Sequence, residues 1–168
     1  MELGTYYYNI QNDDLAMQFR LKADEINTAY QIKNRTVVSN LTGIAQLLIF
    51  SKKISNSRNF DRAEKYVVKA LQIAEEIQND TAIGAVYEKY AHLHAIKQEY
   101  DQAKKYLFKG LKASHNVKDT LRESSIYLSL ARIQEAKKQK DSALFYYQKR
   151  IAILRTSTQK KELAFAYL

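Results

Sequence analysis

Apolar residues recur every three or four positions along most of the chain, which is the spacing that predicts amphipathic helices. Short polar links, such as Asn12–Asp14 and Gln78–Asp80, separate the segments that show this spacing. The pattern therefore predicts an all-α protein. The expected helices are residues 1–9, 14–26, 36–55, 60–77, 81–97, 102–114, 120–138 and 142–155.

The landmarks of one helical hairpin recur about forty residues further along the chain. They are Asp61, Asp101 and Asp141, Ala63, Ala103 and Ala143, and Tyr66, Tyr106 and Tyr146, with Asp14 and Ala16 as an earlier copy. A fixed period of this length is a mark of solenoids, in which each unit buries its apolar face against its neighbours. We therefore expect a single array over 1–168, with units of approximately 1–34, 35–79, 80–118 and 119–157 and a partial fifth helix at 158–168.

The recurring small and acidic residues have physical explanations. Ala91 is expected to face Ala103, and Ala131 to face Ala143, because only small side chains let two helices approach closely. The recurring aspartates are expected to accept hydrogen bonds from free amides at helix starts and to complement the helix dipole.

Composition supports helices and removes several classes of site. The chain has no proline or cysteine and four glycines, so sheet and turn signals are scarce and disulfides and thiolate metal sites are excluded. We see no run of eighteen apolar residues and no signal peptide, which predicts a soluble chain without a membrane span. The compartment stays open, with the cytoplasm favoured over a periplasmic sensor segment. Both ends fall inside a helix, which suggests a fragment of a longer array.

The net charge of +9 is concentrated in the later part of the chain. Residues 1–56 carry six Lys and Arg against five Asp and Glu, whereas residues 57–168 carry twenty-one against thirteen. A basic surface of this kind attracts nucleic acid, anionic membrane or acidic protein. Solvated lysines on outer helix faces are the simpler interpretation.

The hairpin pattern resembles the tetratricopeptide repeat. Tyr127-x-x-Leu130-Ala131-x-Ile133 leads to Asp141-Ser142-Ala143-x-x-Tyr146, and the same order occurs forty residues earlier. The resemblance implies a right-handed α-solenoid that binds an extended or helical peptide in a concave groove. The usual period of this family is 34 residues with a proline at the unit end, so the chain looks like the longer-helix variety found in bacterial signalling proteins.

In such arrays the first helix of each unit lines the groove. By this resemblance we expect Lys52, His92 and Arg132 to attract an acidic peptide or a C-terminal carboxylate. An open alternative is that these residues pair within the chain with Glu88 and Glu135. The neighbouring groove positions are expected to be Leu48, Glu88, Leu128, Tyr8 and Glu135.

Two further functions stay open beside peptide binding. The first is a ligand-sensing segment of a larger bacterial regulator, such as a histidine kinase or a DNA-binding protein. The second is self-association through exposed terminal helices, since apolar residues such as Phe165 and Leu168 would lie at an open end.

Catalytic, metal and cofactor sites are not indicated. His92 and His94 are two positions apart on a helix and so point to different faces, which excludes them as joint ligands of one metal. The sequence has no phosphate loop, nucleophile elbow or His-Glu metal motif, so we expect no enzymatic activity and no cofactor. The repeated tyrosines are more simply core residues than base-stacking platforms, so nucleic-acid binding is not favoured for this segment.

Overall fold

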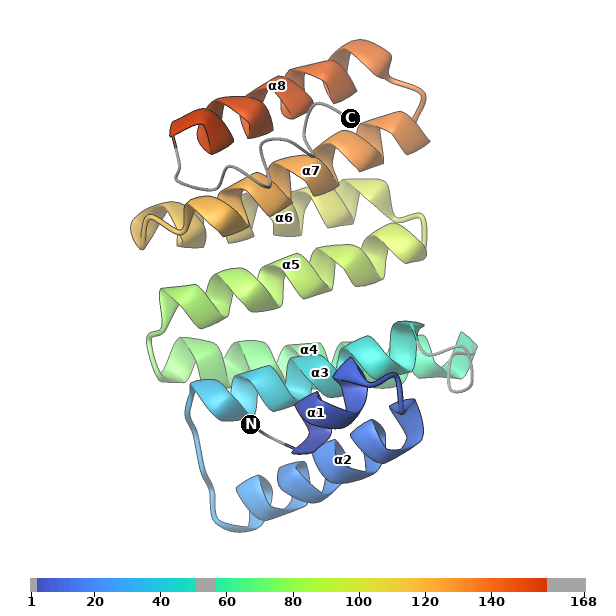
Figure 1. The fold of residues 1–168 in the computed structure, drawn as a ribbon, viewed down its shortest axis with the longest axis vertical. Coiled ribbons are helices and arrows are strands. Elements are labelled where there is room, and N and C mark those ends of the chain that lie inside the picture. Colours follow the sequence, from blue (N-terminus) through green and yellow to red (C-terminus); the bar gives the residue numbers. More distant parts are fainter. Residues whose placement is uncertain (1–2, 51–56, 157–168) are drawn as a thin grey trace. The chain divides into compact units, whose positions relative to one another are not determined.

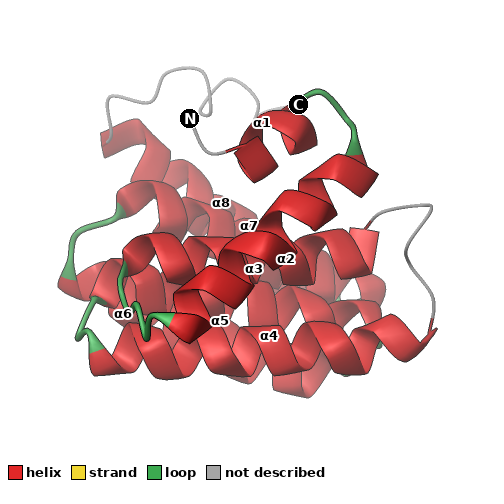
Figure 2. Ribbon diagram, turned by 90° about the horizontal axis from the view of Figure 1, so that it is seen from below, coloured by secondary structure: helices red, strands yellow, loops and turns green. Residues whose placement is uncertain are grey.

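The computed structural model describes residues 3–50 and 57–156, and those ranges contain eight helices and no strand (Figures 1 and 2). The prediction of an all-α protein is therefore confirmed. The chain divides into two compact units, Met1–Ala82 and Ile83–Leu168. No helix in the described ranges is both long enough and apolar enough to cross a bilayer.

The first unit consists of four helices that contact one another in chain order. They are α1 (Leu3–Asn9), α2 (Asp13–Ala29), α3 (Arg35–Phe50) and α4 (Ser57–Glu76). The apolar side of α3 forms the centre of the core, where Leu41, Ile44 and Leu47 are almost completely buried. The predicted start of α4 at Phe60 is wrong, because the helix already begins at Ser57.

The second unit repeats this arrangement with α5 (Asp80–Ile96), α6 (Tyr100–Asn116), α7 (Thr120–Ala136) and α8 (Lys140–Thr156), of which α5 begins three residues before the unit boundary. Its core cluster combines Ala91 of α5, Ala103 and Leu107 of α6, and Ile126 and Leu130 of α7. Both alanines are buried in one cluster, as expected for small residues where helices approach closely. Aromatic stacking adds to this core: the ring centroids of Tyr90 and Tyr106 lie 4.2 Å apart.

The turns that follow six of the helices share one backbone conformation. The residue two positions after each of these helices has a φ of 51° to 61°, in the left-handed region, although it is not glycine. In the turn between α5 and α6, the amide of Gln98 donates to the carbonyl of Ala95 and that of Glu99 to the carbonyl of His94, at 3.0 and 2.9 Å. These bonds satisfy carbonyls at the helix end and offset the steric cost of the left-handed residue. The six residues are Gln11, Gln31, Gln78, Gln98, Lys118 and Lys138.

Four helices are capped by the side chain of the residue directly before them. Asn12, Asn34, Asn79 and Asp119 accept from the amide three residues on, at 2.9 to 3.2 Å. The recurring aspartates instead lie inside the helices, where Asp14, Asp101 and Asp141 occupy first turns and Asp61 is the fifth residue of α4. The first-turn acids still complement the helix dipole.

Candidate functional site

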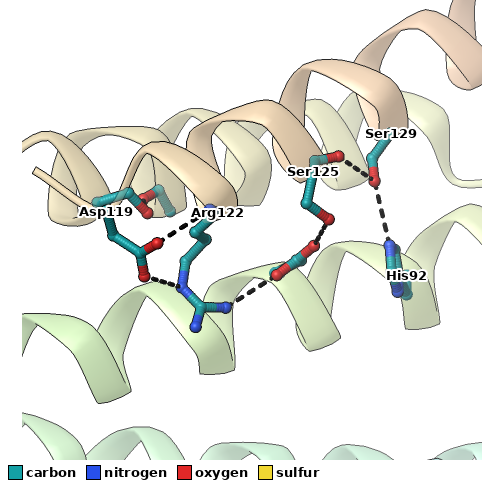
Figure 3. Close-up of polar contacts among 8 residues, drawn as sticks. His92, Asp119, Arg122, Ser125 and Ser129 are labelled. Carbon is teal, nitrogen blue, oxygen red and sulfur yellow. Dashed lines mark hydrogen bonds and ion pairs between the residues drawn. The ribbon is translucent and has the colours of Figure 1, made fainter. Parts of the chain in front are cut away.

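The best-defined polar site in the second unit joins α5 to α7, the first helices of two successive hairpins (Figure 3). Its centre is the carboxylate of Glu88, whose side chain is 12% exposed. Arg122 Nη1 donates to Glu88 Oε2 at 2.9 Å, and the hydroxyl of Ser125 donates to Glu88 Oε1. Asp119 holds the other side of the guanidinium, since Arg122 Nε donates to Asp119 Oδ2 at 3.2 Å. The carboxylate is therefore already occupied by partners within the chain.

One helical turn further along, His92 makes a second connection between the same helices. Its Nε2 lies 3.2 Å from Ser129 Oγ, and Ser129 Oγ donates to the carbonyl of Ser125 at 3.1 Å (Figure 3). Glu88 meets Ser125 and His92 meets Ser129 at the same sequence separation of 37 residues. A constant separation means that α5 and α7 run parallel, with the polar side of one facing the polar side of the other.

Positive charge gathers around this network. Burial lowers the pKa of His92; Glu88 opposes that effect, while Lys89 and Arg132 add to it. Burial also lowers the pKa of Lys89; Glu88 again opposes it and Arg122 adds to it. Glu88 is thus the one acid that acts on both groups, against the cations Lys89, Arg122 and Arg132.

The lowered pKa of His92 predicts a loss of stability in acid. Between its folded pKa and the unfolded value of 6.5, the unfolded chain binds more protons than the folded chain. The contribution of His92 to the free energy of unfolding is therefore fully present above pH 6.5 and is lost as the pH falls below that value. We expect His92→Gln to flatten the dependence of the urea midpoint on pH across this range.

Ser129→Ala serves as the matched control for this prediction. It removes the hydrogen bond to His92 but leaves the ring buried, and burial is the largest cause of the shift. The loss of stability at low pH should therefore persist in Ser129→Ala. An unchanged slope in His92→Gln would show that another group is responsible.

Arg132 and Glu135 lie further along α7, and both are exposed. Glu135 accepts a hydrogen bond from the hydroxyl of Tyr147 on α8; burial first and then this bond raise the pKa of Tyr147, against Arg132 and Arg150. In the described part of the chain, Arg132 has no carboxylate within ion-pair distance. The ion-pair partner of Glu88 is Arg122, which is not a residue of the predicted stripe.

The remaining groove candidates have varied surroundings. Leu48 is 1% exposed, so its side chain belongs to the core and is not accessible to a ligand. Tyr8 is 38% exposed and its hydroxyl accepts from Gln46 Nε2 on α3. Leu128 is half-buried on α7. Lys52 lies outside the described residues.

Sequence reasoning missed Arg122, Ser125 and Ser129. Their spacing of three and four positions puts them on one face of α7, and Glu88 and His92 are also four apart on α5. Two polar stripes with matching spacing on successive first helices were therefore the available signal. To use this signal one must know how far α7 is displaced along α5, and the repeat period alone does not give that displacement.

No family model matches the chain, and no curated protein matches its sequence. The class that the fold defines is a helical repeat-like, all-α protein. Among solved structures it is similar to BtubC (BKLC) from P. vanneervenii, with a TM-score of 0.70 and 19% sequence identity. The match covers 88% of this chain and 58% of that one, so this chain spans little more than half the length of its neighbour. At this level of identity the likeness concerns the fold alone.

Proposed function

We propose that the hairpins form a right-handed solenoid of the tetratricopeptide type and that the chain is a protein-interaction module. Its ligand is an acidic segment, or a C-terminal carboxylate, of another protein, bound along α5 and α7. The observation that carries this proposal is the local excess of positive charge around His92. Glu88, the acid that would balance this charge, is bonded to Arg122 and Ser125.

Arg132 is the residue best suited to contact such a ligand. Its side chain is exposed, and it lies close enough to His92 to lower the pKa of that ring. A guanidinium presents a planar fork of donors that matches a carboxylate. A charge-assisted hydrogen bond of this kind contributes about 1.5–3 kcal/mol when it is shielded from water.

The test is the affinity of a fluorescein-labelled, glutamate-rich peptide with a free C-terminus, measured by fluorescence anisotropy. We expect Arg132→Glu to weaken binding by about tenfold or more, because it removes one charge-assisted bond and adds repulsion. Lys140→Glu is the matched control, since it makes the same charge change at an exposed position at the start of α8. It should leave the affinity within about twofold, as expected for a charge outside the site.

Equal weakening by Arg132→Glu and Lys140→Glu would contradict the proposal, because it would indicate attraction to the net charge alone. A C-terminally amidated form of the peptide separates the two kinds of ligand. Loss of affinity on amidation identifies a terminal carboxylate, whereas unchanged affinity identifies acidic side chains.

Self-association is a second candidate, favoured by one observation on α8. Leu144 and Phe145 are 56% and 51% exposed, which is unusual for two adjacent large apolar residues. Sedimentation velocity over a range of concentrations tests this candidate. A concentration-dependent sedimentation coefficient that is abolished in Leu144→Ser/Phe145→Ser would support it, and a constant coefficient would exclude it.

A further inference from the structure

A second surface lies on α6, where this helix meets α7. A cavity of about 490 Å³ opens there between the two helices. Phe108, Leu111 and Tyr127 supply its apolar lining, and Lys112, His115 and Glu123 supply polar groups. Phe108 is 46% exposed, so a large aromatic ring is available at the cavity.

The exposed side of α6 is strongly basic. Its one acid, Asp101, is paired with Lys137 of α7 at 3.1 Å. Lys109 lies over the rings of Tyr87 and Tyr106, at 5.4 and 5.7 Å from their centroids. In the ranges that the structure describes, none of the lysines of α6 forms an ion pair with a carboxylate. These lysines are Lys104, Lys105, Lys109 and Lys112.

A cavity in the first unit has its charges neutralised. A cavity of about 370 Å³ lies beside α2 and α4, and there Lys69 pairs with Asp24 at 2.7 Å. Lys33 and Glu76 form a second ion pair at this cavity, at 2.6 Å. Lysine and acid therefore balance each other around the cavity of the first unit.

The repeat register shows how the surroundings of these lysines differ between the two units. A lysine stands six residues after the repeat alanine in each second helix, as Lys22, Lys69, Lys109 and Lys149. Asp24, the partner of Lys69, stands eight residues after its alanine, and the corresponding residue of α6 is Leu111. The lysine of α8 has no such acid to pair with, and its ammonium lies over the ring of Phe145 at 5.4 Å. This position is apolar in the other second helices as well, as Leu71 and Ile151, so the junction beside α6 is apolar where α2 carries an acid.

We propose that α6 and its cavity against α7 bind an acidic segment of a partner protein, with one bulky apolar side chain of that segment inside the cavity. The unpaired lysines match carboxylates, and the rings and Leu111 match an apolar side chain. Glu123 at the cavity disfavours an anionic group at that point, phosphate or carboxylate, so an apolar side chain is the better occupant of the cavity. This surface differs from that of the proposed function, because Glu123 and Tyr127 lie on a different side of α7 from Ser125 and Ser129.

The probe is a fluorescein-labelled peptide of glutamates around a single phenylalanine, compared with the same peptide carrying serine in place of that phenylalanine. We expect Lys105→Glu/Lys112→Glu to weaken binding of the phenylalanine peptide by about tenfold or more. Phe108→Ser should weaken binding of the phenylalanine peptide and leave the serine peptide unchanged. Because Phe108 is half exposed, this variant should fold, which circular dichroism checks.

The control variant Lys65→Glu/Lys140→Glu makes the same charge change at two other exposed helix positions. It should bind the phenylalanine peptide with the affinity of the unmodified chain. In an Arg132→Glu background the preference for the phenylalanine peptide over the serine peptide should persist, so that failure of one proposal is distinguishable from failure of the other.

Three results would overturn the inference. The first is equal weakening in the control variant, which would indicate non-specific attraction. The second is an identical affinity for the phenylalanine and serine peptides, which would leave the cavity without a role. The third is tighter binding of a single-stranded oligonucleotide than of the peptide, lost in Lys105→Glu/Lys112→Glu, which would make this a nucleic-acid surface.

Discussion

Replacing Glu88 with alanine is expected to lower the free energy of unfolding of the second unit by about 2–4 kcal/mol. The change removes the acceptor of Arg122 Nη1 and of the Ser125 hydroxyl. It also leaves a largely covered guanidinium with Asp119 as its remaining carboxylate. Urea denaturation followed by circular dichroism measures the effect.

A double-mutant cycle with Arg122→Met isolates the ion pair from other effects of the substitution. The double variant should be less destabilised than the sum of the single variants, because neither charge is then left without its partner. Glu75→Ala on the exposed side of α4 is the control and should change stability by no more than about 0.5 kcal/mol. Additive losses in the cycle would show that the two side chains act independently.

Leu107→Ala is expected to cost about 2–5 kcal/mol, the largest effect of any single substitution considered for this chain. Leu107 is completely buried between α5, α6 and α7, so truncation leaves a cavity as well as removing apolar contact. Thermal and urea denaturation should both report the loss.

The next residue provides a sharp comparison. Phe108 is 46% exposed, and Phe108→Ala should cost about 1 kcal/mol or less because most of the lost area already faces water. Similar losses for the two variants would mean that the helix is rotated relative to the core cluster described above. The pair therefore tests the orientation of α6 directly.

The helices and the core alanines were predictable because they depend on local periodicity. Ala103 and Ala131 are fixed by the repeat, and any hairpin of this spacing must bury them. The helix starts were less well predicted, since Asn12 caps α2 two residues before Asp14 and α4 begins four residues before Asp61. Capping depends on the residue that precedes the first helical turn, which apolar spacing does not locate.

The site was only partly predictable. Glu88, His92 and Arg132 were selected, but the pairing of Glu88 with Arg122 depends on how far α7 is displaced along α5. That displacement is a tertiary property, and Ile126 and Leu130 of α7 pack in the same core cluster as Ala91 of α5. Leu48 was assigned to an accessible groove and is in fact buried, because spacing along a helix does not show which neighbours cover a given face.

The shared left-handed turn has a consequence for how such a chain can change length. Gln98 and Lys138 have φ values of 61° and 59° and stand forty residues apart at the ends of α5 and α7. Joining Gln98 directly to Gln139 would remove α6 and α7. The chain would still leave α5, and would still enter α8, with the backbone geometry that it has now. Gain or loss of a forty-residue segment at these points needs no new linker, so unequal recombination within the gene could lengthen or shorten the protein one hairpin at a time.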